Sequence, residues 1–174
     1  ELKRVVNSLI QNIDALNNNS ILIAATNHHE LLDPAIWRRF STVVTLERPN
    51  LEEIGQLLQL YLKQYPGNIL RKNKKIILLE KAFDGFSHSD IKTTISNSVK
   101  TAIIKGRKEI TVCDILKEIY FYKYHGVENE EEYIRFLLKY GATHKEIDEC
   151  LDISMRKVQD ISKKMEGRRI KYGK

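Results

Sequence analysis

The 174-residue sequence is poor in the residues that mark several protein classes, with two cysteines, three prolines and eight glycines. Two cysteines, Cys113 and Cys150, cannot form a disulfide framework, so a reducing compartment such as the cytoplasm is the default expectation. The sequence leaves open whether these two cysteines pair. No stretch reaches the roughly 18 consecutive apolar residues of a membrane span, so we expect no membrane partner.

The excess of positive charge lies at one end of the chain. The formal net charge is +6, and residues 1–154 carry equal numbers of acidic and basic side chains. The last twenty residues therefore carry the whole excess. A basic end on a neutral body is typical of a protein that contacts phosphate, but a solvated helix end has the same composition. Charge alone favours neither interpretation.

The first 48 residues predict a mixed α/β arrangement. Apolar residues at three- and four-residue spacing predict an amphipathic helix over 2–16. The short apolar runs 21–25 and 43–46 predict strands, and Asp33-Pro34 predicts the start of a short helix over 35–39. Two strands and two helices cannot bury one another. We therefore interpret this region as part of an α/β sheet whose other strands are missing.

The rest of the chain has helical periodicity. We expect four helices, over 50–64 with a stop at Pro66-Gly67, over 73–83, from Ser87 or Ser89 to about 103, and over 111–124. Three more follow, over 133–140, from Thr143 and from Ser154. The predicted fold is mostly α: a remnant of an α/β core with one or two parallel strands, a four-helix unit and a three-helix domain of helix-turn-helix type. The predicted domains span 1–49, 50–125 and 126–174.

A polar amide and two guanidinium groups follow the predicted strand 21–25. Asn27 lies at the carboxyl end of that strand, where ligands bind in open α/β sheets. Arg38 and Arg39 lie at the end of the predicted short helix and carry planar, permanently charged groups suited to phosphate. The simpler alternative is that Asn27 turns the chain and the arginines pair with surface carboxylates.

Residues 1–50 resemble the second region of homology of AAA+ ATPases. The similar segments occur in the family's order: ELKRVVNSLIQNID, ILIAATN, LLDPAIWRRF and VVTLERPN. The resemblance implies that Asn27 is the sensor-1 residue, and that Arg38 and Arg39 occupy arginine-finger positions that reach the ATP of a neighbouring subunit. Of the two, Arg39 is favoured as the finger. The resemblance also implies ATP and Mg²⁺ as cofactors and a homo-oligomeric ring or helical assembly that remodels a client.

The four-helix unit resembles the helical lid of the same family. Gly85-Phe-Ser-His-Ser-Asp-Ile91 is similar to the segment that opens the third lid helix near the adenine. The resemblance implies nucleotide-binding roles for four residues of this segment: Gly85, Ser87, His88 and Ser89. Helix capping is the simpler role for Ser87 and Asp90. The segment 110–114 resembles the start of the last lid helix.

The phosphate-binding loop of these ATPases has no counterpart in the sequence. No Gly-x-x-x-x-Gly-Lys-Ser/Thr motif occurs, and no acidic pair follows an apolar strand to hold Mg²⁺. We expect both elements upstream of Glu1 in a longer parent protein. Residues 1–174 alone are therefore expected not to hydrolyse ATP.

The C-terminal block has the spacing of a helix-turn-helix, with a tight turn at 152–154. It resembles the modules of sigma-type factors and regulators. The candidate DNA-binding residues lie on the second helix: Arg156, Lys157, Gln159, Lys163 and Lys164. Three-helix modules also bind proteins or pack internally, so a DNA-binding or adaptor module is the alternative function. The five histidines and two cysteines lack zinc spacing, and we expect no metal site of their own.

Overall fold

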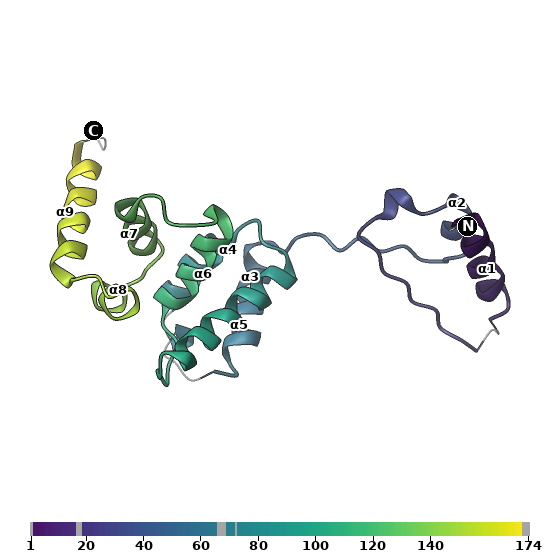
Figure 1. Cartoon of the computed structure of the whole chain (residues 1–174), viewed down its shortest axis with the longest axis horizontal. Coiled ribbons are helices and arrows are strands. Elements are labelled where there is room, and N and C mark those ends of the chain that lie inside the picture. Colours follow the sequence, from purple (N-terminus) through teal and green to yellow (C-terminus); the bar gives the residue numbers. More distant parts are fainter. Residues whose placement is uncertain (1, 17–18, 66–68, 72, 172–174) are drawn as a thin grey trace. The chain divides into compact units, whose positions relative to one another are not determined.

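The computed structural model describes residues 2–16, 19–65, 69–71 and 73–171, without the side chains of 2, 3, 71 and 166–171. The chain divides into two compact units, 1–46 and 47–174 (Figure 1). Within the described residues, no helix is both long and apolar enough to cross a bilayer. The predicted helix stop at Pro66-Gly67 and the end of the basic tail, residues 172–174, lie outside the described residues.

The described residues of the first unit form one amphipathic helix and two short helical turns. The helices are α1 (Leu2–Asp14), η1 (His29–Leu31) and α2 (Pro34–Trp37). The Asp33 carboxylate accepts a hydrogen bond of 2.8 Å from the Ala35 amide, and Pro34 takes the first helical position. The predicted helices at 2–16 and 35–39 are therefore confirmed, with ends two or fewer residues away.

The predicted strands at 21–25 and 43–46 are not formed. Both segments lack regular secondary structure, and the described part of the chain contains no β-strand. Ile21, Ile23 and Leu46 are 86–90% exposed. A strand needs a backbone partner for its amide and carbonyl groups, and neither segment pairs with the other. Both segments are apolar, as a buried strand requires, but they could form a sheet only with partner strands that the described residues do not supply.

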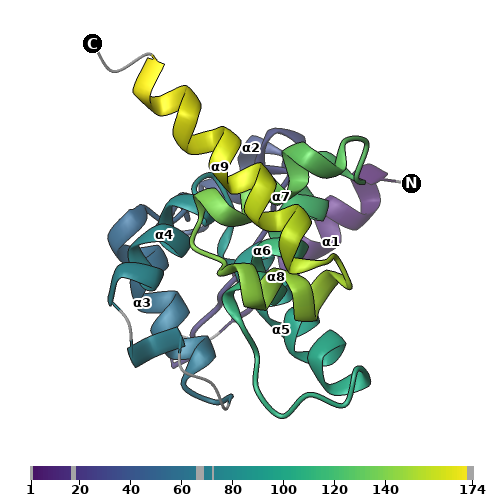
Figure 2. The same cartoon turned by 90° about the vertical axis from the view of Figure 1, so that its left-hand side faces the viewer.

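The second unit is wholly helical, which confirms a mostly α fold. Its elements, in chain order, are α3 (Leu51–Leu62), η2 (Ile69–Arg71), α4 (Asn73–Phe83), α5 (His88–Ile104), α6 (Val112–Tyr124), α7 (Glu130–Lys139), α8 (His144–Leu151) and α9 (Met155–Lys171). Figure 2 shows α9 running beside α7 and α8, and both pairs are in contact. α7 starts three residues earlier than predicted, because Asn129 caps it and three glutamates occupy its first turn, where acidic side chains favour the helix dipole.

Four helices of this unit begin with the same reciprocal cap. In each helix, the side chain of the capping residue accepts a hydrogen bond from the backbone amide three residues later. The acidic side chain of that later residue accepts a hydrogen bond from the backbone amide of the capping residue. The pairs are Asn50–Glu53, Ser87–Asp90, Thr111–Asp114 and Thr143–Glu146. Because each pair lies within four consecutive residues, the start of each of these helices can be predicted from the sequence.

One continuous apolar core joins the seven α-helices found among the described residues of the second unit. α5 packs closely on α6, α3 packs on α4, and α6 also contacts α7 and α8. The largest fully buried side chains come from both sides of residue 125: Ile54, Leu58, Leu79, Phe83, Phe86, Ile91, Ile95, Ile115, Leu116, Ile119, Ile134 and Leu137. The predicted domain boundary at 125/126 stays a prediction, and across it the two segments share this core.

Candidate functional site

The predicted catalytic residues of the first unit lie around α2. Asn27 is an exposed residue at a bend, and the preceding Thr26 hydroxyl accepts a hydrogen bond of 3.0 Å from the His28 amide. Arg38 and Arg39 follow the last turn of α2, where Arg38 is the capping residue. Asn27 and the two arginines thus stand before and after one short helix within the same unit.

Arg39 is held firmly by the end of α1. Its Nε and one Nη donate to the two carboxylate oxygens of Asp14 at 2.7 and 2.9 Å. Its other Nη donates to the Ala35 carbonyl at 2.9 Å. The hydrogen bonds from Arg39 lower the pKa of Asp14 below its usual value, and the same contact raises the pKa of Arg39. A forked pair of this kind fixes the direction of the guanidinium as well as its charge.

Arg38 has the opposite environment. Its side chain is exposed and makes no hydrogen bond or ion pair with any residue that the structure describes. The surface-pairing alternative therefore applies to Arg39, whereas Arg38 presents an unengaged guanidinium to solvent. Asp14 is the functional residue that sequence reasoning missed here, because its partner lies 25 residues away.

The second group of predicted residues forms the turn before α5. Gly85 has a φ of +84°, a backbone conformation that residues with a Cβ rarely adopt. Ser87 caps α5, so its capping role is confirmed. His88 and Ser89 are exposed in the first turn of the helix. These four residues surround a helix N-terminus whose free amides favour an anionic group.

Two residues that the sequence did not single out complete this turn. Arg48 donates through an Nη to the Gly85 carbonyl at 2.7 Å. The hydroxyl of Tyr122 lies beside the Asp90 carboxylate, and its ring lies 4.2 Å from that of Phe86. Hydrogen bonds from Ser87 and then Tyr122 lower the pKa of Asp90, with a contribution from the Arg48 charge. The turn therefore combines one fixed cation, one anion and an exposed aromatic ring.

The third group lies on α9, which begins shortly after the end of α8. Asp152 ends α8 with a φ of +55°, and α9 starts three residues later. All five candidate DNA-binding residues are exposed. Two of them already have acidic partners on α7: Lys157 pairs with Glu130, and Lys164 lies 3.8 Å from Glu131. Three candidates remain without such a partner among the described residues: Arg156, Gln159 and Lys163.

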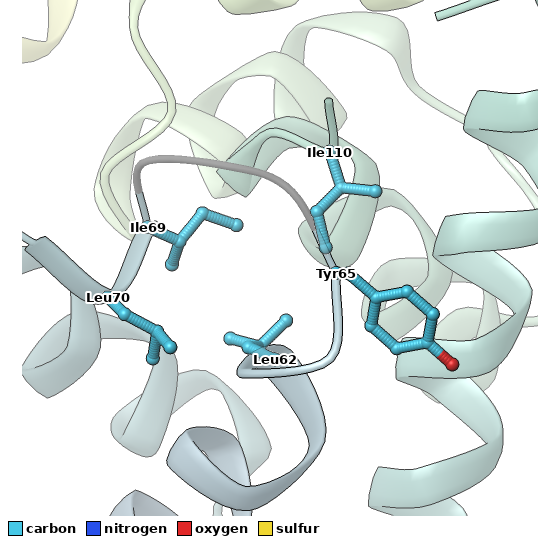
Figure 3. A pocket seen from close by; sticks show the side chains of 5 residues that line it. All are labelled: Leu62, Tyr65, Ile69, Leu70 and Ile110. Carbon is cyan, nitrogen blue, oxygen red and sulfur yellow. The ribbon is translucent and has the colours of Figure 1, made fainter. Parts of the chain in front are cut away.

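A small apolar hollow in the second unit lies apart from the predicted site residues. An apolar hollow of about 10 Å³ is lined by five residues: Leu62, Tyr65, Ile69, Leu70 and Ile110 (Figure 3). This volume is close to that of one water molecule. None of the predicted site residues lines it. Within the part of the chain that the structure describes, no group of three or more His, Cys, Asp or Glu side chains is arranged to hold a metal ion.

The comparisons with known proteins identify the family to which the chain is similar. Residues 1–48 match the family model described as "ATPase family associated with various cellular activities (AAA)". The chain is similar to the "Uncharacterized AAA family ATPase y4kL" of Sinorhizobium fredii, with 38% identity over 110 residues, 63% of this chain and 32% of that protein. It is also similar to the proteasome-activating nucleotidase of Saccharolobus islandicus, with 31% identity over 123 residues, 68% of this chain and 30% of the relative. The corresponding nucleotidase of Methanothermobacter thermautotrophicus is 31% identical over 137 residues, 76% of this chain and 32% of the relative.

The chain belongs to the AAA+ ATPases. It spans about a third of the length of the curated relatives that it matches. No solved structure matches it. The resemblance inferred from the four segments of residues 1–50 is therefore confirmed, while the roles of single residues and the helix-turn-helix function stay predictions.

Proposed function

We propose that this chain is the part of an AAA+ ATPase that completes an ATP site shared between subunits. In this proposal Asn27 contacts the γ-phosphate or the attacking water in its own subunit, and an arginine after α2 reaches the ATP of the neighbouring copy. Phosphoryl transfer builds negative charge on the equatorial oxygens, and a guanidinium supplied by the neighbour neutralises it. ATP and Mg²⁺ are the cofactors, with the Mg²⁺ ligands outside this sequence.

The observation that carries the proposal is the difference between the two arginines. The sequence resemblance favours Arg39 as the finger, but its three hydrogen bonds to Asp14 and Ala35 already fix its guanidinium. Arg38 is exposed and unengaged among the described residues. The contacts therefore support Arg38 as the arginine that reaches the neighbouring ATP, and Arg39 as the residue that positions α2 against α1.

The turn before α5 supplies the lid side of the proposed nucleotide site. The free amides at the start of α5, beside Ser87, His88 and Ser89, favour a negatively charged ligand. Arg48 adds a fixed positive charge at the Gly85 carbonyl. ATP binding would draw the core and the lid together, and hydrolysis would release them, which is how we expect the assembly to move a client.

A finger supplied by a neighbour requires a head-to-tail interface, which generates a ring or a helical filament. The exposed apolar segments 21–25 and 43–46 fit the same proposal, because further strands of a complete α/β core would cover them. We propose a homo-oligomer on these grounds.

The proposal is tested by steady-state ATP turnover of a complete ATPase containing this chain. Arg38→Ala should lower kcat about 10³-fold or more while ATP binding persists. Asn27→Ala should also lower kcat strongly. Arg4→Ala, an exposed arginine on α1, is the matched control and should leave turnover unchanged. Normal turnover of the Arg38→Ala enzyme would refute the role assigned to Arg38.

A second candidate function is nucleic-acid binding by α9. The supporting observation is that α9 follows a tight left-handed turn and exposes Arg156, Gln159 and Lys163 near its start. Lys157 and Lys164 contribute less to the proposed nucleic-acid binding, because acidic residues of α7 already neutralise their charges. A DNA-binding or adaptor module would use this surface independently of ATP hydrolysis.

A further inference from the structure

The two cysteines of the chain interact in the core, although they are 37 positions apart in the sequence. Cys113 is in the first turn of α6, and Cys150 is in the last turn of α8. Both are free thiols and almost completely buried, with exposed fractions of 0% and 2%. The Cys150 thiol donates to the Asp114 carboxylate at 3.4 Å, and Asp114 directly follows Cys113 in the chain. Cys150 therefore contacts the residue that follows Cys113, and the two thiols also interact with each other.

The interaction between the two thiols makes them chemically unequal. Asp114 also accepts from both Nη atoms of Arg107 and from the amide and hydroxyl of Thr111, so its oxygens are fully occupied. The interaction with Cys113 lowers the pKa of Cys150, and the same interaction, followed by burial, raises the pKa of Cys113. Cys150 is thus the better nucleophile, because the thiolate is the reactive form.

The junction around this pair is incompletely bonded. Arg107 Nε and the Tyr133 hydroxyl are buried without a hydrogen-bond partner among the described residues. Burial is the main cause that raises the pKa of Tyr133, and the two nearby thiols raise it further. α8 has only eight residues and ends in a left-handed residue, Asp152. Short helices with unsatisfied neighbours open locally more readily than long, fully bonded ones. Opening of α8 would expose Cys150 first.

We propose that Cys113 and Cys150 are an oxidisable pair that forms a reversible disulfide between α6 and α8. The oxidant class is a hydroperoxide. The Cys150 thiolate attacks one peroxide oxygen, the O–O bond breaks, and the leaving oxygen takes a proton and departs as water or alcohol, which leaves a sulfenic acid. The Cys113 sulfur then attacks the Cys150 sulfur, and the sulfenic oxygen leaves with two protons as water. A thiol reductant restores both cysteines by exchange.

The bond would fasten the segment α7–α9 to α6. It joins residues on the two sides of position 125, where the sequence predicts a domain boundary, and closes a loop that contains all of α7. Oxidation would therefore restrict movement of the C-terminal segment relative to α6 and raise resistance to unfolding. This inference does not depend on the proposed ATPase role, because it concerns only residues of the second unit.

The test treats the folded full chain with hydrogen peroxide and follows intact mass and non-reducing electrophoresis. We expect a monomer that has lost two hydrogen atoms, a single Cys113–Cys150 peptide after digestion, and reversal by dithiothreitol. The urea midpoint of the oxidised chain should shift upward. The Cys113→Ser variant should instead accumulate a dimedone-reactive sulfenic acid at Cys150, and the Cys150→Ser variant should react more slowly.

Three results would overturn the proposal. The first is a chain that keeps both thiols after peroxide while circular dichroism shows it folded. The second is a disulfide that links two chains rather than one. The third is oxidation that occurs only above the urea midpoint. All three are read on the wild-type chain, so they remain decisive if either serine variant fails to fold.

Discussion

Asp14, the last residue of α1, accepts hydrogen bonds from the Nε and one Nη of Arg39 through its two carboxylate oxygens, at 2.7 and 2.9 Å. The contact ties the end of α1 to the residues that follow α2. It separates two adjacent arginines into one that is engaged within the chain and one that faces solvent. This division is the basis of the proposed role of Arg38.

The Asp14–Arg39 contact should respond to acid in a defined direction. The pKa of Asp14 is lowered from 3.8 by hydrogen bonding to Arg39, so any stability it contributes is complete above 3.8 and is lost as the pH falls through the lowered value. Carboxyl carbon NMR should show Asp14 titrating below 3.8 in the native chain. In the Arg39→Ala variant the titration should return to the ordinary value. An unchanged titration in that variant would show that the contact is absent in solution.

A second prediction concerns the buried carboxylate of α6. Burial raises the pKa of Asp114, but hydrogen bonds from Arg107 and Thr111 outweigh it and hold the pKa below its usual value. Asp114→Asn leaves Arg107 without its counter-charge, so we expect a loss of about 3 kcal/mol or more in the free energy of unfolding by urea. Asp160→Asn on the exposed face of α9 is the matched control and should change stability by less than about 0.5 kcal/mol. Equal effects of the two substitutions would contradict the buried ion pair.

A third prediction concerns the glycine between α7 and α8. Gly141 has a φ of +98°, and an added Cβ would lie 2.9 Å from the Cδ1 of Leu78 on α4. Gly141→Ala should therefore destabilise the chain by about 1–2 kcal/mol from backbone strain, with the steric contact adding to the loss. Gly126, where a Cβ would meet open space, provides the control, and Gly126→Ala should be nearly neutral in urea unfolding. A neutral Gly141→Ala would mean that this turn differs from the one described.

Local signals account for most of what the sequence predicted correctly. The helix starts at Ser87, Thr111 and Thr143 depend on side chains three residues apart, which are in reach of each other in any helix. The resemblance of residues 1–50 rests on short motifs as well. The prediction of strands at 21–25 and 43–46 was wrong, because a strand forms only when a distant segment of backbone pairs with it, whatever its local propensity.

The missed residues share the same physical cause. The partners of Asp14, Arg48 and Cys150 lie 25, 37 and 36 residues away in the chain. No periodicity or motif encodes such contacts. The split between Arg38 and Arg39 was likewise invisible, because two adjacent arginines have the same chemistry until a third residue engages one of them. The sequence therefore predicts the candidate residues, and the tertiary contacts distinguish between them.

A fourth prediction tests the α9 surface. If α9 binds nucleic acid, fluorescence anisotropy with a duplex should show affinity that falls steeply with salt. Arg156→Ala and Lys163→Ala should weaken binding more than Lys157→Ala and Lys164→Ala, because the last two lysines already face Glu130 and Glu131. The Lys157 and Lys164 variants are matched in charge to the first pair and serve as controls. No binding at low salt would leave the C-terminal helices as a protein-binding or packing element.

The central claim is that the charge of Arg38 acts on the ATP of a neighbouring subunit. The most direct measurement is ATP turnover after mixing two inactive full-length variants, Arg38→Ala and Asn27→Ala. A pocket from the first variant keeps Asn27 and can receive Arg38 from the second, so about a quarter of the sites in a random equimolar head-to-tail assembly should be complete and active. We predict that turnover reappears on mixing. Two variants that are each inactive alone and stay inactive after confirmed co-assembly would contradict the claim.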